Sequence, residues 1–399
     1  MDRRKICVMG LGYIGLPTAA LLANKGFEVK GVDINKSIVE TINEGNIHIV
    51  EPGLDKYVKK AVMNNKLHAR LEPSIADIFI IAVPTPFHEG FKPNIDYIIE
   101  ATKAIAPFVK ENNIVILEST SPVGTTEKVG QTLQAEGIDI SKIFISHCPE
   151  RVLPGNIMNE LVENDRIVGG INKQSTIETI QFYEKFVNGK IFATDSKTAE
   201  MAKLTENSFR DVNIAFANEL SILCDQLNID CHELIKLANR HPRVNILNPG
   251  PGVGGHCIAV DPWFIIHKDP KNAKIIKTAR DINIYKTEWV IKKIRAAALN
   301  FEKVNGNKPK IACFGLSFKP DIDDLRGSPA LSIAKKLKSY KYEILAVEPN
   351  INKHEDFEIF HYNEAINNAD LIAILVAHNE FKKLNIKTDL DFCGLLNIS

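Results

Sequence analysis

Three glycines, Gly10, Gly12 and Gly15, follow an apolar stretch at residues 5–9 and open a helical pattern that runs to Leu22. This G-x-G-x-x-G spacing restricts the fold more than any other feature, because between a strand and a helix it is typical of a parallel α/β unit. The glycines allow the pyrophosphate of a dinucleotide to lie on backbone amides at the helix N-terminus, where the helix dipole favours an anion. A glycine-rich turn that binds nothing is the alternative.

A second apolar strand, residues 27–32, ends at Asp33, 18 positions after Gly15. An acidic residue at this place is suited to bind the ribose hydroxyls of a dinucleotide. Its negative charge would repel a 2′-phosphate. The sequence therefore predicts NAD rather than NADP as the cofactor.

The α/β alternation continues through three more apolar stretches, at residues 76–83, 113–118 and 142–147. Ligands bind beyond the carboxyl ends of parallel strands. We therefore expect Thr85, Thr120 and Thr126, which follow the first two of these stretches, to reach a cofactor or a substrate. Ordinary capping of turns explains each single hydroxyl equally well.

A stretch free of proline and glycine, from Lys197 to about Leu227, predicts a long helix. Lys203, Asn207 and Arg210 stand at i, i+4 and i+7, so they share one face of it. A polar stripe of this kind is commonly a solvated surface. Because the helix is otherwise apolar and lies between two α/β units, a buried site or a dimer interface is the other explanation.

Residues 249–264, PGPGVGGHCIAVDPWF, are rich in glycine and proline, and they place Cys257 four positions before Asp261. Glycine lets the backbone approach a ligand closely, and proline stiffens the chain. The cysteine in such a segment is either packed into a turn or presented as a nucleophile. The segment by itself leaves both explanations open.

After residues 305–309, NGNKP, a second α/β unit repeats the first. Three segments match in the same order: 310–317 with 5–12, 342–350 with 27–35, and 369–376 with 76–83. The second unit lacks the glycine triplet, so we expect it to bind a different, nucleotide-like ligand. Ser328 and Pro329 suit a helix N-cap and first helical residue, and Lys319 and Arg326 before them are candidates to face a phosphate or a carboxylate.

These patterns predict an α/β protein with two Rossmann-like parallel-sheet domains joined by a central helical segment. We expect an N-terminal domain at residues 1–196, a central domain at 197–304 and a C-terminal domain at 305–399. A chain of 399 residues is too long for one ordinary core, which agrees with several domains.

Composition narrows the partners and the compartment. With 49 basic and 49 acidic residues the chain has no net charge, so we expect neither nucleic acid nor a membrane as a partner. The seven cysteines are scattered and odd in number, which argues against disulfides or a metal site and favours a reducing compartment. The N-terminus enters a strand directly, and no apolar run reaches the ~18 residues of a membrane span. We expect a cytoplasmic protein without a metal.

An NAD site, a presented cysteine and a lysine–asparagine helix face together suit the oxidation of an alcohol beyond the aldehyde. One hydride transfer takes an alcohol only to an aldehyde. Reaching the acid requires a covalent thiohemiacetal, a second hydride transfer that leaves a thioester, and then hydrolysis. Cys257 would supply the thiol.

From residue 5 to about 380 the sequence resembles the UDP-glucose/UDP-N-acetylmannosamine dehydrogenase family of nucleotide-sugar dehydrogenases. The motifs that match in order are Gly10-x-Gly12-Tyr13-x-Gly15, Val83-Pro-Thr85-Pro, Ser119-Thr120-x-Pro-Val-Gly, Lys203-Leu-x-x-Asn207, Gly254-Gly-x-Cys257-x-x-x-Asp261, and Phe318-Lys319 followed by Arg326. Residues 148–155 and 239–264 look most like the members that oxidise UDP-N-acetyl-D-mannosamine for surface polysaccharide such as enterobacterial common antigen.

The resemblance implies a role for each matched residue. Cys257 carries the thioester, Lys203 exchanges the proton and steadies the oxyanion, and four further residues assist the oxygen or the hydrolytic water: Asn207, Asp261, Thr120 and Glu150. The residues implied in NAD binding are Gly10, Gly12, Tyr13, Ile14, Gly15, Asp33, Thr85, Thr126 and Arg326. Those implied in binding the UDP-sugar are Arg151, Val152, Lys203, Asn207, Arg210, His241, Arg243, Gly254, Phe318 and Lys319. His241 and Arg243 are expected to reach into the neighbouring subunit's site in a homodimer.

Two departures from the family pattern bear on the substrate. Pro154 stands where the UDP-glucose members have an acidic residue, which weakens UDP-glucose as the substrate. The short tail lacks the basic residue that often completes the uridine pocket. The alternatives are a UDP-N-acetylglucosamine or UDP-glucose 6-dehydrogenase, a two-electron hydroxyacid-type dehydrogenase with a structural Cys257, and a non-enzymatic NAD sensor. Two NADH per sugar rather than one would separate four-electron from two-electron oxidation.

Overall fold

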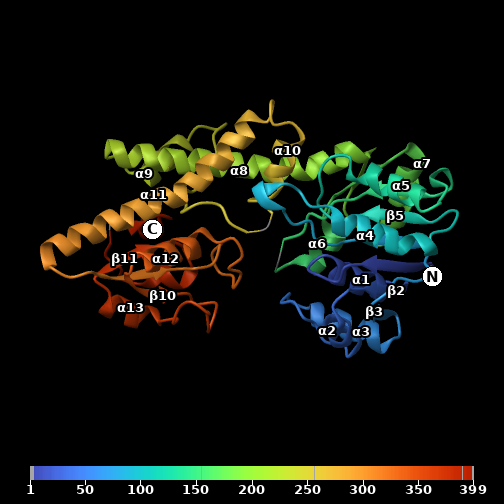
Figure 1. The fold of residues 1–399 in the computed structure, drawn as a ribbon, viewed down its shortest axis with the longest axis horizontal. Helices are drawn as coiled ribbons and strands as arrows, with labels where there is room; N and C mark the ends of the chain where they lie inside the picture. The colour runs from blue at the N-terminus through green and yellow to red at the C-terminus, as the bar shows by residue number, and fades with distance from the viewer. Residues whose placement is uncertain (1–3, 154, 256, 389, 398–399) are drawn as a thin grey trace. The chain divides into compact units, whose positions relative to one another are not determined.

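A computed structural model describes residues 4–153, 155–255, 257–388 and 390–397. The chain folds into two compact units, an N-terminal unit of residues 1–205 with 263–268 and a C-terminal unit of residues 206–262 with 269–399. Each unit contains a mainly parallel sheet with helices, and long helices occupy the middle of the sequence, so the predicted fold class is confirmed (Figure 1). In the described part of the chain, no helix is both long and apolar enough to cross a membrane.

The N-terminal unit is built on an eight-stranded sheet of order β3-β2-β1-β4-β5-β6-β7-β8. Its strands are β1 (Lys5–Met9), β2 (Glu28–Val32), β3 (Leu67–Arg70), β4 (Ile78–Ile81), β5 (Ile114–Leu117), β6 (Phe144–His147), β7 (Arg166–Gly170) and β8 (Ile191–Asp195). Neighbouring strands are parallel except β6 and β7, which are antiparallel. The sequence predicted β1, β2, β4, β5 and β6, whereas β3, β7 and β8 extend the sheet at its two sides.

Helices cover both faces of this sheet because its strands are apolar on both sides. Ile6 and Val8 on β1 pack into one core with residues of α1, α3 and α6, while Cys7 and Met9 pack into another with residues of α4 and α5. The helices are α1 (Gly15–Asn24), α2 (Lys36–Asn43), α3 (Leu54–Met63), α4 (Asp96–Ile105), α5 (Thr125–Ala135), α6 (Ile157–Glu163) and α7 (Lys173–Tyr183), and α10 (Asp261–Lys268) contributes residues 263–268.

The C-terminal unit has a four-stranded parallel sheet of order β10-β9-β11-β12. Its strands are β9 (Lys310–Phe314), β10 (Glu343–Val347), β11 (Leu371–Ile374) and β12 (Leu390–Asp391), and its helices are α9 (Cys231–Ala238), α11 (Lys274–Asn305), α12 (Pro329–Ser339) and α13 (Tyr362–Asn368). The helix predicted from Lys197 to Leu227 is α8 (Ser196–Leu227), in which the boundary between the units falls. Short 3-10 turns lie at η1 (Glu89–Phe91), η2 (Ala106–Phe108), η3 (Ile140–Lys142), η4 (Asn379–Lys383) and η5 (Leu395–Asn397).

The two α/β parts resemble each other even in one individual hydrogen bond, which an acidic residue after the second strand of each part accepts. Asp33, after β2, accepts the Leu11 N–H at 3.0 Å, and Glu348, after β10, accepts the Leu316 N–H at 2.8 Å. The sheet orders correspond as well, since β9, β10 and β11 take the places of β1, β2 and β4. The C-terminal sheet is a shortened version of the N-terminal one, as the sequence repeat predicted.

Candidate active site

The glycine loop after β1 has the form of a dinucleotide cradle. A Cβ on Gly15 would lie 1.8 Å from the Gly10 oxygen, and Gly10 itself has a φ of +90°, so these two glycines serve the close packing of the turn. A Cβ on Gly12 would meet no described atom within 4 Å, which leaves room for a ligand to approach the backbone. No described side chain caps the start of α1 at Ile14, and a helix start of this kind offers N–H donors to an anion.

Asp33 is oriented by two backbone donors. Its Oδ2 accepts the Leu11 N–H at 3.0 Å, and its Oδ1 accepts the Asn35 N–H at 2.9 Å. Because Leu11 lies within the glycine loop, Asp33 stands beside the cradle, and it remains partly exposed. Tyr13, in the same loop, is exposed. This arrangement fits NAD, with the diphosphate at Gly12 and a ribose at Asp33.

The three threonines predicted beside this site differ in what they bind. The Thr85 hydroxyl donates to the Thr120 carbonyl at 2.7 Å, which joins the ends of β4 and β5. Thr126 is fully buried, and its hydroxyl and N–H donate to Glu200 Oε1 at 2.6 and 2.7 Å. Glu200 also accepts the Gly124 N–H at 2.6 Å, so it caps α5 from α8. The Thr126 hydroxyl thus has a protein acceptor, and sequence reasoning missed Glu200 because no local pattern pairs it with α5.

Glu150 lies in a buried cluster beyond the ends of β5 and β6. Its Oε2 is 3.0 Å from Arg166 Nη1, and its Oε1 accepts the Arg151 N–H at 2.7 Å. The Arg166 guanidinium lies over the Tyr183 ring at 4.9 Å, and Tyr183 donates its hydroxyl to Glu118 at 2.6 Å. Burial first, and the Glu150 charge second, raise the pKa of Glu118 to about 7. Sequence reasoning missed Arg166, Tyr183 and Glu118, which come from separate elements and form no motif.

Cys257 is exposed to solvent. All seven cysteines lie within the described residues, and Cys257 alone is exposed. Burial raises the pKa of Cys7 to about 11 and that of Cys148 and Cys313 to about 12. Because the thiolate is the nucleophile, these buried thiols are unreactive near neutral pH. The exposed Cys257 is therefore the candidate nucleophile.

The turn that follows Cys257 is fixed by α8. The Cys257 carbonyl accepts the N–H groups of Val260 and Asp261 at 3.0 and 2.9 Å. Asp261 is buried, and its Oδ2 accepts a hydrogen bond from Asn207 Nδ2 on α8 at 2.5 Å. The structure thus brings together Asn207, Asp261 and the turn of the cysteine, three elements that the motifs placed in one site.

A buried ion pair supports the same turn. Arg280 Nη1 on α11 lies 2.7 Å from Asp211 Oδ1 on α8 and 3.5 Å from the Ile258 carbonyl. Asn283 donates to the same Asp211 oxygen at 2.8 Å. Burial raises the pKa of Asp211 to about 6, although the Arg280 charge opposes that shift. Sequence reasoning missed this pair, since the two residues are 69 positions apart.

Lys203 and Arg210, the other members of the predicted polar face, differ in exposure. Lys203 is half-buried and belongs to the N-terminal unit, which ends on α8 at Thr205. Arg210 is exposed and belongs with Asn207 to the C-terminal unit. The structure therefore places Asn207 against Asp261 and assigns Lys203 to the unit that holds the glycine loop.

The structure explains why glycine is required at the positions before Cys257, which the sequence did not indicate. A Cβ on Gly254 would lie 2.6 Å from the Gly327 oxygen and 2.8 Å from Phe318 Cβ. Gly255 has a φ of +81°, and a Cβ there would lie 2.9 Å from the Phe318 ring. The protein's own loop therefore fills the Cβ positions of both glycines. Gly255 N–H donates to the Arg326 carbonyl at 3.2 Å, which holds the two segments together.

The remaining predicted residues lie on or near the surface. Arg151 Nη1 donates to the Asp165 carbonyl at 3.2 Å, and Val152 packs against the core of the N-terminal unit. Arg326 pairs with Asp324 at 2.6 Å. Of these predicted residues, four are exposed: Lys319, Arg326, His241 and Arg243. Pro154 lies outside the described residues.

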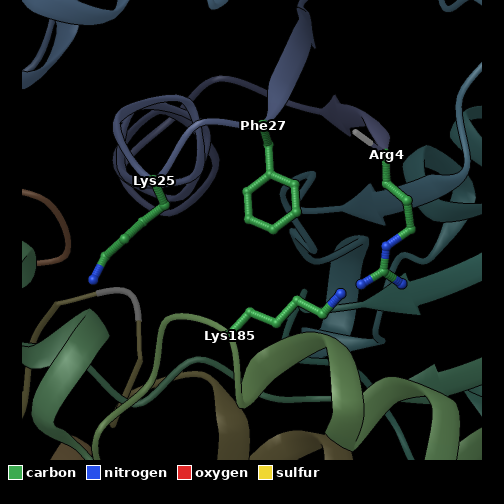
Figure 2. Close-up of a pocket in the computed structure, with 4 residues that line it drawn as sticks. All are labelled: Arg4, Lys25, Phe27 and Lys185. Atoms are coloured by element: carbon green, nitrogen blue, oxygen red, sulfur yellow. The ribbon is translucent and has the colours of Figure 1, made fainter. Parts of the chain in front are cut away.

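A hollow of about 510 Å³ on the N-terminal unit is lined by Arg4, Lys25, Phe27 and Lys185. Figure 2 shows the Phe27 ring between the Lys25 and Arg4 side chains. Arg4 and Phe27 precede β1 and β2, whereas the glycine loop and Asp33 follow these strands. The hollow is therefore at the opposite edge of the sheet from the dinucleotide cradle.

The fold and the glycine loop with Asp33 define the class of the protein, an α/β dehydrogenase that uses NAD. Three profiles of the UDP-glucose/GDP-mannose dehydrogenase family match in succession: the NAD-binding domain at residues 4–187, the central domain at 197–285 and the UDP-binding domain at 312–391. The chain belongs to this family. It is an NAD-dependent oxidoreductase that oxidises a nucleotide sugar.

Similar proteins match over nearly the whole chain. A UDP-N-acetyl-D-mannosamine dehydrogenase of Campylobacter jejuni is 55% identical, over 98% of this chain and 99% of its own. An NDP-N-acetyl-D-galactosaminuronic acid dehydrogenase of Ralstonia nicotianae is 51% identical, over 96% and 93%. The solved UDP-N-acetyl-mannosamine dehydrogenase of Staphylococcus aureus superposes with a TM-score of 0.88 at 40% identity, over 98% and 99%.

Proposed function

We propose that the enzyme oxidises the C6 alcohol of UDP-N-acetyl-D-mannosamine to the carboxylate, a four-electron oxidation that proceeds through a thioester on Cys257. The observation that carries the covalent route is the exposed Cys257, whose turn is bound through Asp261 to Asn207. The names of the Campylobacter and Staphylococcus relatives support this sugar.

The proposed roles follow the chemistry of the residues. NAD, when bound, supplies the hydride acceptor for both oxidations. Lys203 takes the proton from the C6 hydroxyl as the aldehyde forms, and the Cys257 sulfur then adds to the aldehyde carbon to give a thiohemiacetal. Loss of the second hydride leaves a thioester. Water directed by Asp261 and Asn207 attacks its carbonyl, and the C–S bond breaks to release the carboxylate and the thiol.

Stoichiometry and one variant test this proposal. The pure protein with NAD and UDP-N-acetyl-D-mannosamine is expected to release two NADH per sugar. Cys257→Ser is expected to lose uronate production, because an oxygen ester or adduct hydrolyses slowly, while Cys231→Ser, a half-exposed thiol elsewhere, retains it. One NADH per sugar, or normal uronate production by Cys257→Ser, would overturn the covalent route.

A second candidate substrate comes from the Ralstonia relative, whose name specifies an N-acetylgalactosaminuronic acid. N-acetylmannosamine and N-acetylgalactosamine are the C2 and the C4 epimer of N-acetylglucosamine. A panel of UDP-N-acetylmannosamine, UDP-N-acetylgalactosamine, UDP-N-acetylglucosamine and UDP-glucose therefore separates the candidates. The highest kcat/KM assigns the sugar. We expect the mannosamine derivative to give it.

The working unit that we propose is a homodimer formed along α8. Phe209, Phe216 and Leu223 are spaced by seven residues and are 68%, 51% and 47% exposed. A heptad of large apolar side chains on one helix suits packing against a second helix. His241 and Arg243 are exposed, as residues that reach a neighbouring subunit must be.

We propose a three-domain organisation with boundaries at residues 196/197 and 304/305, and a cytoplasmic enzyme. Its uronate product would serve surface polysaccharide of the enterobacterial common antigen type. The matched NAD-binding, central and UDP-binding segments support the order of the domains.

A further inference from the structure

A buried carboxylate–imidazole pair occupies the place in the C-terminal sheet that Asp33 has in the N-terminal one. Glu348 follows β10, and its Oε2 accepts the N–H groups of Leu316 and Ser317 at 2.8 and 3.0 Å. His378, after β11, lies with Nε2 3.0 Å from the same oxygen, and both side chains are fully buried. Burial raises the pKa of Glu348, but these donors lower it to about 2, so the carboxylate is ionised. Glu348 thus binds the protein's own groups rather than a ribose.

The other edge of the His378 ring, at Nδ1, binds the loop between β9 and α12. The Asp321 N–H donates to His378 Nδ1 at 2.9 Å, which makes Nδ1 an acceptor and places the ring proton on Nε2, toward Glu348. Asn379, the next residue, donates its N–H to Asp321 Oδ1 at 2.9 Å and its Nδ2 to Asp321 Oδ2 at 2.5 Å. Three hydrogen bonds therefore connect Asp321 to the His378–Asn379 pair.

The connection matters because Asp321 has an unfavourable backbone conformation. Its φ is +62°, a left-handed value that aspartate adopts more readily than most residues but that still costs free energy unless its surroundings stabilise it. The segment between β9 and α12, residues 315–328, is much longer than the glycine loop at residues 10–14. A long loop with a strained turn needs such tertiary contacts to keep one shape.

The same loop carries the residues proposed to bind the nucleotide sugar. Phe318 N–H donates to the Asp324 carbonyl at 3.2 Å, and the Ser317 hydroxyl donates to the Lys319 carbonyl at 2.8 Å. Asp321 lies between Lys319 and Asp324 in the sequence, inside the turn that the Phe318–Asp324 hydrogen bond closes. Fixing Asp321 therefore restrains the turn that carries Phe318 and Lys319.

We infer that His378 and Asn379 are positioning residues for the nucleotide sugar, which act through Asp321 to hold residues 317–324 in the shape that binds the uridine diphosphate. The inference rests on the proposed roles of Phe318 and Lys319. Without these contacts the loop must be ordered when the ligand binds, and this ordering weakens affinity without changing the reacting groups.

Matched substitutions separate the two edges of the ring. His378→Gln places an amide near the Nε2 position and loses the acceptor for Asp321, whereas His378→Asn places an amide oxygen near Nδ1 and keeps it. Asn379→Ala removes the side-chain bond to Asp321, together with one from Lys382, at an exposed position. It therefore tests the inference even where substitutions of the buried His378 impair folding. The controls are Asn368→Ala and His361→Gln, whose side chains form hydrogen bonds within α13 and at its N-cap.

Calorimetric titration with UDP is the direct measurement. His378→Gln and Asn379→Ala are each expected to raise the Kd for UDP, and the KM for the sugar, about fivefold to tenfold per hydrogen bond lost. His378→Asn and both controls are expected to stay within twofold of the unsubstituted enzyme, as are kcat and the KM for NAD in every variant. Unchanged UDP affinity in Asn379→Ala, or equal losses in the Gln and Asn variants, would overturn the inference.

UDP is the probe because its binding does not depend on which sugar is oxidised. If the unsubstituted enzyme binds UDP but oxidises a different UDP-sugar, the proposed substrate is wrong. The changes in the Kd for UDP then still test whether His378 and Asn379 position the loop. If it binds no UDP, both the proposed substrate class and the inference fail.

Discussion

Asn207 and Asp261, 54 positions apart, are joined by a hydrogen bond of 2.5 Å from the amide Nδ2 to the carboxylate Oδ2. Asp261 lies four positions after Cys257, and its N–H donates to the Cys257 carbonyl at 2.9 Å. This hydrogen bond therefore connects the long helix α8 to the turn that contains the exposed Cys257. Both partners of the bond are buried, which makes the contact rigid.

Asn207→Ala is expected to lower kcat about 100–1,000-fold, the range found when one positioned hydrogen-bond donor is removed from an active site. It also leaves the buried Asp261 carboxylate without this donor, which costs ~1–3 kcal/mol in the free energy of unfolding. Steady-state kinetics and urea unfolding measure the two effects. The control is Asn213→Ala on the same helix, where the lost bond goes only to the Phe209 carbonyl. Equal kcat values for the two variants would remove Asn207 from the proposed mechanism.

Asp33→Asn keeps an acceptor for the Leu11 or Asn35 N–H group but removes the negative charge. Because hydrogen bonds to a charged group are stronger, the KM for NAD is expected to rise about tenfold or more. The relative use of NADP is expected to rise, since the charge that repels a 2′-phosphate is gone. Initial rates with both cofactors test this. Glu40→Ala, on exposed surface of α2, serves as the control, and an unchanged preference for NAD would contradict the assigned role.

Glu118 makes stability depend on pH. Its pKa is raised from 4.5 to about 7 in the folded protein, first by burial and then by the Glu150 charge. The folded state therefore holds this proton more tightly than the unfolded state, and the stabilisation from it is fully present below about pH 4.5 and is lost as pH rises through about 7. Glu118→Gln mimics the protonated group and keeps an oxygen for the Tyr183 hydroxyl.

For this variant we expect unfolding free energies close to those of the unsubstituted enzyme at pH 5 and higher at pH 8, by on the order of 1–3 kcal/mol. Urea unfolding at the two pH values measures the difference. Glu160→Gln provides a control on more exposed surface of the same unit. A variant that is less stable than the unsubstituted enzyme at pH 8 would show that Arg166 needs the Glu118 charge.

Phe216→Asp places a charge in the middle of the exposed heptad on α8, where Phe216 is 51% exposed. Because burying an unpaired carboxylate between two helices is unfavourable, the dimer is expected to dissociate at micromolar concentration. Sedimentation velocity measures the change in mass. Met63→Asp on α3, at a position 74% exposed, is the control that should leave the mass unchanged. A dimer that survives Phe216→Asp would place the interface elsewhere.

Local signals predicted the elements that position the candidate site. The strand at residues 5–9, the glycine triplet with the helix after it, the long helix α8 and the Ser328 N-cap were predicted from the sequence and are confirmed. Each depends on residues within a few positions of one another, where periodicity, turn chemistry and capping act. The repeat of the two sheets was also visible, because corresponding strands carry similar residues in the same order.

The long-range partners were not predictable in this way. Arg166 with Glu150, Arg280 with Asp211, and the Glu200 cap on α5 connect separate elements, and no spacing rule relates their members. The antiparallel pairing of β6 with β7 was missed for the same reason. A sequence pattern can predict that a segment is a strand, but it does not predict which strand lies beside it.

The sequence by itself determined the class of fold, the NAD cradle with Asp33 and the segment that carries Cys257, because local backbone preferences and apolar periodicity specify such features. Only the tertiary structure decided that Cys257 alone among the cysteines is exposed, that Asn207 binds Asp261, and that the Cβ positions of Gly254 and Gly255 are filled by the Phe318 loop. Exposure, hydrogen-bond partners and close packing depend on which distant segments meet, and that is set by the whole fold.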